Sequence, residues 1–363
     1  MKEKKAVTRY VGIDLGKRTY EVAIVGKGGV KKSNGKTCAN GRQWLYKKLL
    51  PSDKVALEAG NMAFIMAKEI EAAVGCRVYV LNPSHLALIY GSMKKTDKED
   101  SLKLAHIIED FQEERLPVVP VPSDKEMRRR KMLGSYRRTQ QSRSREINKL
   151  HALFVAQGIT TMVRKDLSTD GQRQESVKML TSLEREEAEY LVKSLALHEG
   201  RIDELALQIK QESEGDEVIE RLQEVPGVGP LVAFAFTAHV AAGRFDDPSQ
   251  VSNYLGLVPK VYMSGDTVKY GRITKRGNGY LRALLVMSAW ALVRTKKGSK
   301  LKERFEYMTV EKSKSKKKAI VAIARRIGEL LYILMRDGTG YEPRPFIREK
   351  KELEELAQLA ISV

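Results

Sequence analysis

Four acids in the first third of the chain have the residue type and placement of a metal-binding cluster. Asp14 ends the apolar run "YVGIDL", Glu58 ends "VALE", and Asp97 and Asp100 lie three residues apart in "KKTDKEDSLKLAHII", on one face of a predicted helix. Clustered carboxylates repel one another, and a hard divalent cation relieves that repulsion; oxygen-only ligands favour Mg²⁺ or Mn²⁺. The four acids predict metal-assisted phosphoryl chemistry. Taken singly, each is also compatible with turn or cap chemistry, as Asp97 is with a helix cap.

The elements that position these acids follow from the apolar patterning. We expect strands near 7–15, 20–26, 54–58 and 77–81, a short strand near 117–121, and helices near 41–50, 62–74 and 97–113. A strand hairpin followed by strand–helix–strand units predicts a mixed sheet covered by helices, which is an α/β domain.

The remaining sequence divides into an arm and a third region. From 123 to 215 charged helical sequence dominates, and Ile202, Leu205 and Ile209 have heptad-like spacing, which fits a long coiled-coil arm or a packed helical hairpin. From 216 the chain is mostly helical, with one strand-like interruption at "PKVYMSGDTVKYG". The predicted domains are therefore 1–122, 123–215 and 216–363.

The charge points to a polyanionic partner. The chain has 65 Lys and Arg against 46 acids, a formal net charge of +19. Two windows, 124–150 and 294–326, carry net charges of +7 and +10, since they hold ten and thirteen basic residues against three acids each. Such an excess favours nucleic acid through counterion release. In the first window the predicted contacts are Arg128, Arg129, Arg130, Lys131, Arg137 and Arg138.

Two motifs in the last third also fit nucleic acid. In "IERLQEVPGVGPLVAFAF", Gly227 and Gly229 lie in a tight turn between helices, a helix-hairpin-helix-like pattern that brings backbone N–H groups to a phosphate; a glycine turn between core helices is the alternative. "SGD" at 264–266 predicts a hairpin turn, where a serine is ordinarily turn chemistry. Further predicted nucleic-acid contacts follow that turn: Lys269, Arg272, Lys275, Arg276 and Arg282.

Other protein classes fit poorly. The longest uncharged apolar run, 283–293, is shorter than the roughly 20 residues of a membrane span, and "MKEKKAVTRY" lacks a signal-peptide core. Cys38 and Cys76 provide neither a disulfide framework nor metal-ligand spacing. We expect a cytoplasmic, nucleoid-associated protein.

Combined, these motifs resemble one known family. "VGIDLGKRTYEVAIV", "ALEAG" and "KKTDKEDS" are similar to the three acid motifs of the DEDD transposases and Piv-like DNA invertases. "LGLVP", "SG" and "GRITKRGNGYLR" are similar to the C-terminal domain of the same insertion-sequence enzymes, and the resemblance covers roughly 7–120 and 217–295.

The resemblance implies a fold and a mechanism. It implies a RuvC-like, ribonuclease-H-like first domain whose metal ligands are Asp14, Glu58, Asp97 and Asp100, and a C-terminal domain in which Ser264 is the nucleophile. Ser264 would attack a DNA phosphate to form a phosphoserine, with Mg²⁺ or Mn²⁺ assisting, and a metal ion or a basic neighbour such as Lys275 or Arg276 would activate it. The partners implied are DNA, a structured guide RNA (bridge RNA) and further copies of the chain, as a dimer or tetramer.

Three rival functions predict different observations. A RuvC-like Holliday-junction endonuclease would use water in place of Ser264 and leave no covalent adduct. An actin-like sugar kinase shares the first-strand pattern "GIDLG", but its second phosphate hairpin and adenosine loop are not found in the sequence. A non-catalytic nucleic-acid scaffold would not require all four acids and the serine.

Overall fold

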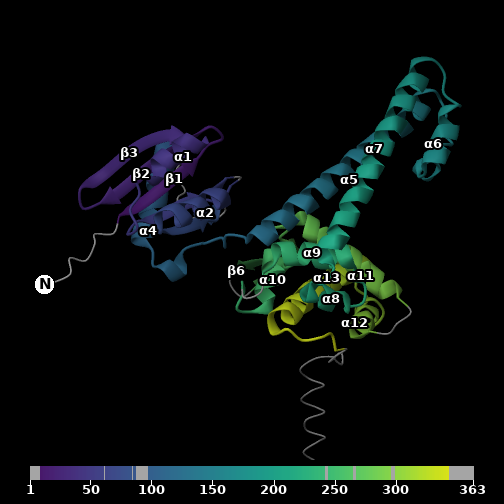
Figure 1. Cartoon of the computed structure of the whole chain (residues 1–363). Coiled ribbons are helices and arrows are strands. Elements are labelled where there is room, and N and C mark those ends of the chain that lie inside the picture. The colour runs from purple at the N-terminus through teal and green to yellow at the C-terminus, as the bar shows by residue number, and fades with distance from the viewer. Residues whose placement is uncertain are drawn as a thin grey trace, which may run out of the picture. The chain divides into compact units, whose positions relative to one another are not determined.

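The computed structural model describes residues 9–60, 62–83, 85–86, 97–241, 244–264, 267–295 and 299–342, without the side chains of Asp97 and Lys98. The chain forms two compact units, Met1–Ser123 and Asp124–Val363 (Figure 1). The predicted arm and the third region therefore belong to one compact unit. In the described part of the chain, no helix is both long enough and apolar enough to cross a bilayer.

The first unit contains a mixed sheet of five strands in the order β3-β2-β1-β4-β5. β1, β2 and β3 are antiparallel neighbours, whereas β4 and β5 run parallel to β1. The strands are β1 (Tyr10–Leu15), β2 (Thr19–Gly26), β3 (Gly29–Lys36), β4 (Lys54–Glu58) and β5 (Arg77–Leu81). The expected α/β architecture with a mixed sheet is confirmed.

Helices cover both faces of this sheet because its strands alternate apolar side chains toward each face. Ile13 and Leu57 pack with α1 (Ala39–Tyr46) and α2 (Ala63–Val74) in one core. Ala56, Tyr79 and Leu81 pack on the other face against α4 (Asp97–Asp110). A short 3₁₀ turn, η1 (Glu113–Arg115), follows α4.

The structure differs from the predicted strands at two places. β3 was not expected, because "GVKKSNGK" has one apolar residue and almost no buried surface; it is held by pairing with β2 at the edge of the sheet. The segment 117–121 forms only an isolated bridge, Leu81 to Val118, and not a strand.

Two long helices that pack side by side form the arm: α5 (Asp124–Ala156) and α7 (Ser182–Ser213) (Figure 1). At its tip, η2 (Arg164–Leu167) and α6 (Asp170–Val177) close a small separate core with Phe154, Leu180 and Leu195. Leu205 and Ile209 are buried, so the heptad-like spacing does mark the packed face of α7.

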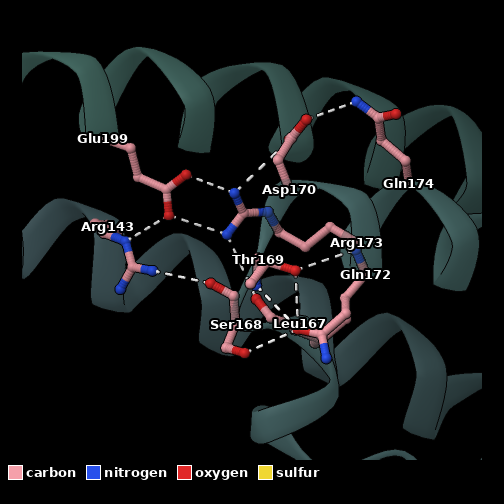
Figure 2. Close-up of polar contacts among 9 residues, drawn as sticks. All are labelled: Arg143, Leu167, Ser168, Thr169, Asp170, Gln172, Arg173, Gln174 and Glu199. Carbon is pink, nitrogen blue, oxygen red and sulfur yellow. Dashed lines mark hydrogen bonds and ion pairs between the residues drawn. The ribbon is translucent and has the colours of Figure 1, made fainter.

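An ion network around one buried arginine joins α6 to the two long helices. The guanidinium of Arg173 in α6, which is fully buried, binds both carboxylate oxygens of Glu199 in α7, at 3.0 and 2.5 Å (Figure 2). Arg143 of α5 donates to the same carboxylate at 2.8 Å. Burial raises the pKa of Glu199, but the hydrogen bonds from Arg173 and Arg143 outweigh it and lower the pKa below its ordinary value.

In its described residues, the body of the second unit is helical around one large core, with a single two-stranded hairpin. α9 lies in the centre and its segment Ala233–Ala238 is buried. The strand-like interruption expected near 259–271 is confirmed. The elements are α8 (Glu217–Gln223), α9 (Pro230–His239), α10 (Pro248–Tyr254), β6 (Pro259–Ser264), β7 (Thr267–Ile273), α11 (Gly279–Arg294), α12 (Lys300–Thr309) and α13 (Lys316–Asp337).

Candidate active site

Asp14 and Glu58 lie at the carboxyl ends of two neighbouring parallel strands. β1 pairs with β4 through Ile13 opposite Leu57, and each acid is the next residue of its strand. Because Ile13 and Leu57 face α1 and α2, strand alternation turns both acids toward the face that α4 covers. Asp14 is half-buried and Glu58 is exposed. The strand register thus gathers these two carboxylates at one edge and on one face.

α4 crosses this face so closely that only glycine fits beneath it. A Cβ on Gly12 would lie 1.9 Å from the carbonyl oxygen of Ser101 and 2.6 Å from the backbone nitrogen of Ala105. Asp100 directly precedes Ser101, so it is held over the same part of β1 that carries Asp14. Its Oδ1 accepts a hydrogen bond from the Lys103 ammonium at 3.0 Å. Asp97 begins α4, and its side chain lies outside the description.

A further acid on this face was missed from the sequence. Glu21 of β2 is the cross-strand partner of Asp14, so their side chains share a face. The signal is the alternation in "TYEVA", where Tyr20 and Val22 pack with α1 and α2 and Glu21 points away from them.

The acids fit a hard divalent cation by donor type, although they do not form a finished site. Asp14, Glu58 and Asp100 offer only carboxylate oxygens, the donors that Mg²⁺ prefers. Among the residues described, no three His, Cys, Asp or Glu side chains converge closely enough to hold a metal ion. A complete ligand set therefore requires Asp97 or a movement of these side chains.

Ser264 ends β6 at the tip of an exposed hairpin. Ser264 lies opposite Thr267, and Tyr262 lies opposite Lys269. Since opposite residues and residues two apart share a face, these four side chains form one polar face. The other face is apolar and exposed: Val261, Met263, Val268 and Tyr270. The turn residues Gly265 and Asp266 lie outside the description.

The loop after the hairpin is locked by backbone packing. Gly256 and Gly277 both have positive φ, and a Cβ on either would meet backbone at 2.2 and 1.9 Å, from Arg276 and Tyr254 respectively. Lys275, also at positive φ (56°), bonds through its N–H to the Gly256 carbonyl at 3.1 Å. Arg282 donates to the carbonyls of Leu255 and Arg276. Much of "GRITKRGNGYLR" therefore fixes this loop.

Comparison with known proteins places the chain. Residues 11–159 match the model of the DEDD transposases of IS110 elements, and residues 219–306 match that of the transposase IS116/IS110/IS902 family. A "Probable family 20 transposase" of Pseudomonas aeruginosa is 28% identical over 345 residues, covering 92% of this chain and 98% of that one. The chain belongs to the IS110/IS116 family of DEDD transposases.

Two further relatives agree. The transposase for insertion sequence element IS1328 of Yersinia enterocolitica is 26% identical over 300 residues, with 77% of this chain and 82% of the relative covered. The transposase for element IS1111A of Coxiella burnetii is 32% identical over 129 residues, or 35% of each chain. The protein is accordingly a DNA transposase.

Packing requires a glycine at one of the two turn positions of the transposase but not at the other. Gly227 has φ of +84°, and a Cβ there would lie 2.4 Å from the Ser288 carbonyl oxygen of α11. Packing against α11 therefore explains Gly227 without a ligand. Gly229 precedes α9 and has open space at its Cβ position, so packing does not require a glycine there. Ser288 is buried in α11, as a core serine should be.

The basic residues of α5 are not equivalent in the transposase. Arg129, predicted as a nucleic-acid contact, is only 3% exposed; it binds Asp216 at 2.5 Å and Thr237 at 2.9 Å and stacks over Phe234. That prediction conflicts with its burial, because a guanidinium committed to the core cannot reach a phosphate. Arg130 donates to the Ala238 carbonyl at 2.6 Å and is half-buried.

The other predicted contacts on α5 are exposed. Arg128 pairs with Glu212 at 3.0 Å, and Arg137 stacks over Tyr280 with 5.3 Å to the ring centroid. Lys131 and Arg138 are also exposed. Beyond the hairpin, Lys269, Arg272, Lys275 and Arg276 present their side chains to solvent, while Arg282 is half-buried.

Two titratable groups near the buried N-terminal part of α5 have shifted pKa values. Burial raises the pKa of Asp216, but hydrogen bonds from Lys125 and Arg129 outweigh it and bring the pKa to about 2. Burial, reinforced by Arg130 and Arg244, lowers the pKa of His239 to about 4. His239 is thus neutral in the folded protein at physiological pH.

Proposed function

We propose that this transposase cleaves and rejoins DNA strands through a phosphoserine at Ser264, assisted by a divalent metal ion that Asp14, Glu58, Asp97 and Asp100 hold. The observation that carries the proposal is the polar face of the hairpin, where an exposed serine, a tyrosine and a lysine lie together. An exposed hydroxyl beside an ammonium group is suited to a phosphodiester.

The first unit supports a ribonuclease-H-like, RuvC-like fold for the metal-binding role. Its strand order β3-β2-β1-β4-β5 and the acids at the ends of the adjacent strands β1 and β4 agree with that fold. Mg²⁺ or Mn²⁺ there would polarise the phosphoryl oxygens and stabilise the leaving oxygen. The four carboxylates would orient the ion, and α4, fixed against Gly12, would set the position of Asp97 and Asp100.

The covalent step exchanges one phosphate ester for another. Ser264 Oγ attacks the phosphorus, the Oγ–P bond forms as the P–O3′ bond breaks, and the 3′ oxygen leaves with a proton while the hydroxyl loses its own. A 3′ hydroxyl of another strand then attacks the phosphoserine and regenerates Ser264. Because one ester replaces another at each step, rejoining needs no ATP.

Lys269 fits the role of the neighbouring cation better than Lys275 or Arg276. Lys269 lies diagonally across from Ser264 on the same face, where Cα atoms are about 7–8 Å apart. Thr274 bonds to Val258, six residues before Ser264, and Lys275 follows it, which places Lys275 about 20 Å away along β6. The ammonium of Lys269 would bind a non-bridging phosphate oxygen.

The DNA substrate, and a structured guide RNA, would be contacted through the exposed basic residues. The charge excess and the exposure of Lys131, Arg137, Arg138 and Arg272 support a polyanion surface. The backbone N–H of Gly229, directly before α9, would add one further donor. The guide RNA is proposed from the resemblance and this charge.

The test is a covalent-capture assay with a DNA substrate, guide RNA and Mg²⁺. The wild-type protein should form a denaturant-resistant protein–DNA adduct at Ser264, and Ser264→Ala should abolish it while DNA binding persists. Cleavage without an adduct would instead favour a nuclease that uses water. Adduct formation by the alanine variant would refute the nucleophile.

A further inference from the structure

The outer face of α7 carries an apolar stripe that none of the described residues of its own unit covers. Leu183, Tyr190 and Leu197 are 71%, 70% and 76% exposed. They are spaced seven residues apart, so they lie on one line along the helix, and the line is about 21 Å long. Single exposed apolar residues are ordinary, but three in heptad register are not.

This stripe is separate from the face that builds the arm. Ala188, Leu191 and Leu195 of α7 are at most 3% exposed and pack into the tip core with Leu150 and Phe154. The Arg173–Glu199–Arg143 network and α6 complete that inner side (Figure 2). The folding of the arm therefore leaves the stripe available.

We propose that the stripe is a self-association surface, on which α7 of a second copy of this chain packs in the antiparallel direction about a two-fold axis at Tyr190. In that arrangement Leu183 of one copy meets Leu197 of the other, and the two Tyr190 rings meet at the axis. A seam with heptad spacing is complementary to another helix with the same spacing, and a two-fold pair satisfies both copies with one surface.

The charged residues beside the stripe favour a second copy of the chain as the partner and an antiparallel direction of the two α7 helices. Glu186 and Lys193 are exposed and lie on the same flank of the stripe. In the antiparallel pair Glu186 comes within one residue of the level of Lys193 in the second copy, giving two equivalent ion pairs. A parallel pair would instead place Glu186 beside Glu187 of the second copy, which is repulsive.

Nucleic acid is a poor occupant of this surface. The acids Glu186, Glu187 and Glu189 lie within the first two turns of the stripe, and a phosphate backbone would be repelled there. The surface is independent of the chemistry proposed at Ser264, because it involves no residue of the acid cluster or the hairpin.

The first experiment measures association of the full-length protein, freed of nucleic acid, by sedimentation over a range of concentrations. The wild type should dimerise, and Leu183→Glu with Leu197→Glu should raise the dissociation constant at least about tenfold. Val310→Glu is the matched control, since Val310 is 74% exposed but lies outside α7. A monomeric wild type, or a double variant that dimerises as the wild type does, overturns the proposal.

The second experiment tests direction by cysteine crosslinking in a Cys38→Ser background, since Cys38 is the exposed native cysteine and Cys76 is buried. A tagged Leu183→Cys chain is mixed with an untagged Leu197→Cys chain and oxidised with copper–phenanthroline. The antiparallel seam predicts the mixed disulfide between the two chains. Only like-with-like disulfides would show a parallel pair, and no disulfide would show that the stripes do not meet.

Charge exchange provides a third measurement that a nonspecific apolar contact would not reproduce. Glu186→Lys and Lys193→Glu should each weaken dimerisation several-fold, because each places like charges together. The double exchange should restore it, since the ion pairs reform with reversed polarity. Failure of the double variant to recover contradicts the assigned register.

Discussion

The acid cluster and the serine hairpin are built in opposite ways. Asp14, Glu58 and Asp100 project from a sheet and a helix, each beside one residue that is at most 1% exposed: Ile13, Leu57 and Ser101. α4 is packed directly against Gly12. Ser264 projects from a two-stranded hairpin that is exposed on both faces. A hairpin of this kind has little stability of its own in water.

The acid cluster lies on a rigid part of the transposase, whereas the serine lies on a part with little packing of its own. The acids can be held in place before DNA arrives, because core packing fixes their backbones. In the proposed mechanism, contacts with DNA would position Ser264, because the described residues at the end of the hairpin are exposed while the loop at its base is packed closely at Gly256 and Gly277. Substitutions should therefore act through chemistry or folding in the sheet, and through substrate positioning in the hairpin.

The largest effect is expected from removing an acid. Asp14→Asn should lower DNA cleavage by about 10³-fold or more, about 4 kcal/mol in the barrier, because the carboxylate set loses a charge. The thermal unfolding midpoint should change little. Chelation of divalent metal should lower cleavage as the substitution does. Cleavage that persists in EDTA would show that the reaction does not use a metal ion.

The next effect concerns the packing beneath α4. Gly12→Ala should destabilise the first unit by about 3 kcal/mol or more, since the added Cβ collides with backbone that cannot move aside. Gly28→Ala is the control, because its Cβ position is open. Chemical denaturation measures the free energy of unfolding of both variants. Equal stabilities would mean that α4 does not pack directly against β1.

Lowering the pH should destabilise the second unit more than the first. His239 has a folded pKa of about 4 against an ordinary 6.5, so between these values the unfolded chain binds a proton that the folded chain does not. Stability of the second unit should therefore fall as pH drops from 6.5 to 4, by up to about 3 kcal/mol. His239→Gln should flatten this slope in denaturation curves. The Asp216 contribution is lost separately, as pH falls from about 4 toward 2.

A smaller effect distinguishes two lysines of the hairpin region. Lys269→Ala should reduce the rate of adduct formation about 10-fold to 10²-fold with little change in stability, because its ammonium lies on the face of Ser264. Lys275→Ala should affect DNA affinity more than this rate. If single-turnover kinetics show the reverse ranking, the basic loop and not the strand supplies the cation.

The smallest effect contrasts the surface of α5 with its interior. Lys131→Ala should lower the slope of log affinity against log salt by about 1 and leave stability unchanged. Arg129→Ala should leave that slope unchanged but destabilise the protein, since Asp216 and Thr237 each lose a buried hydrogen-bond donor. A changed salt slope for Arg129→Ala would show that it reaches nucleic acid after all.

The sequence was informative where burial controls the pattern. β1, β4 and β5 are apolar runs, and the acids at the ends of β1 and β4 could be placed together from strand order alone. β3 could not be predicted, because pairing with β2 and not burial holds it. Arg129 was misassigned because a run of basic residues on a helix does not show which one turns inward.

The site depended on register, which the sequence does not contain. The sharing of one hairpin face by Ser264, Lys269 and Tyr262 follows from which residues pair, and Glu21 was overlooked for the same reason. Phosphate binding by Gly227 stays a prediction, and close contact with α11 supplies a sufficient structural reason for that glycine.

The most direct measurement of the central claim is mass spectrometry of the protein after reaction with DNA in Mg²⁺ and rapid denaturation. A nucleotide mass attached to the peptide containing Ser264, absent in Ser264→Ala and in Asp14→Asn, is the predicted result. An adduct on any other residue, or undiminished strand transfer by Ser264→Ala, would contradict it.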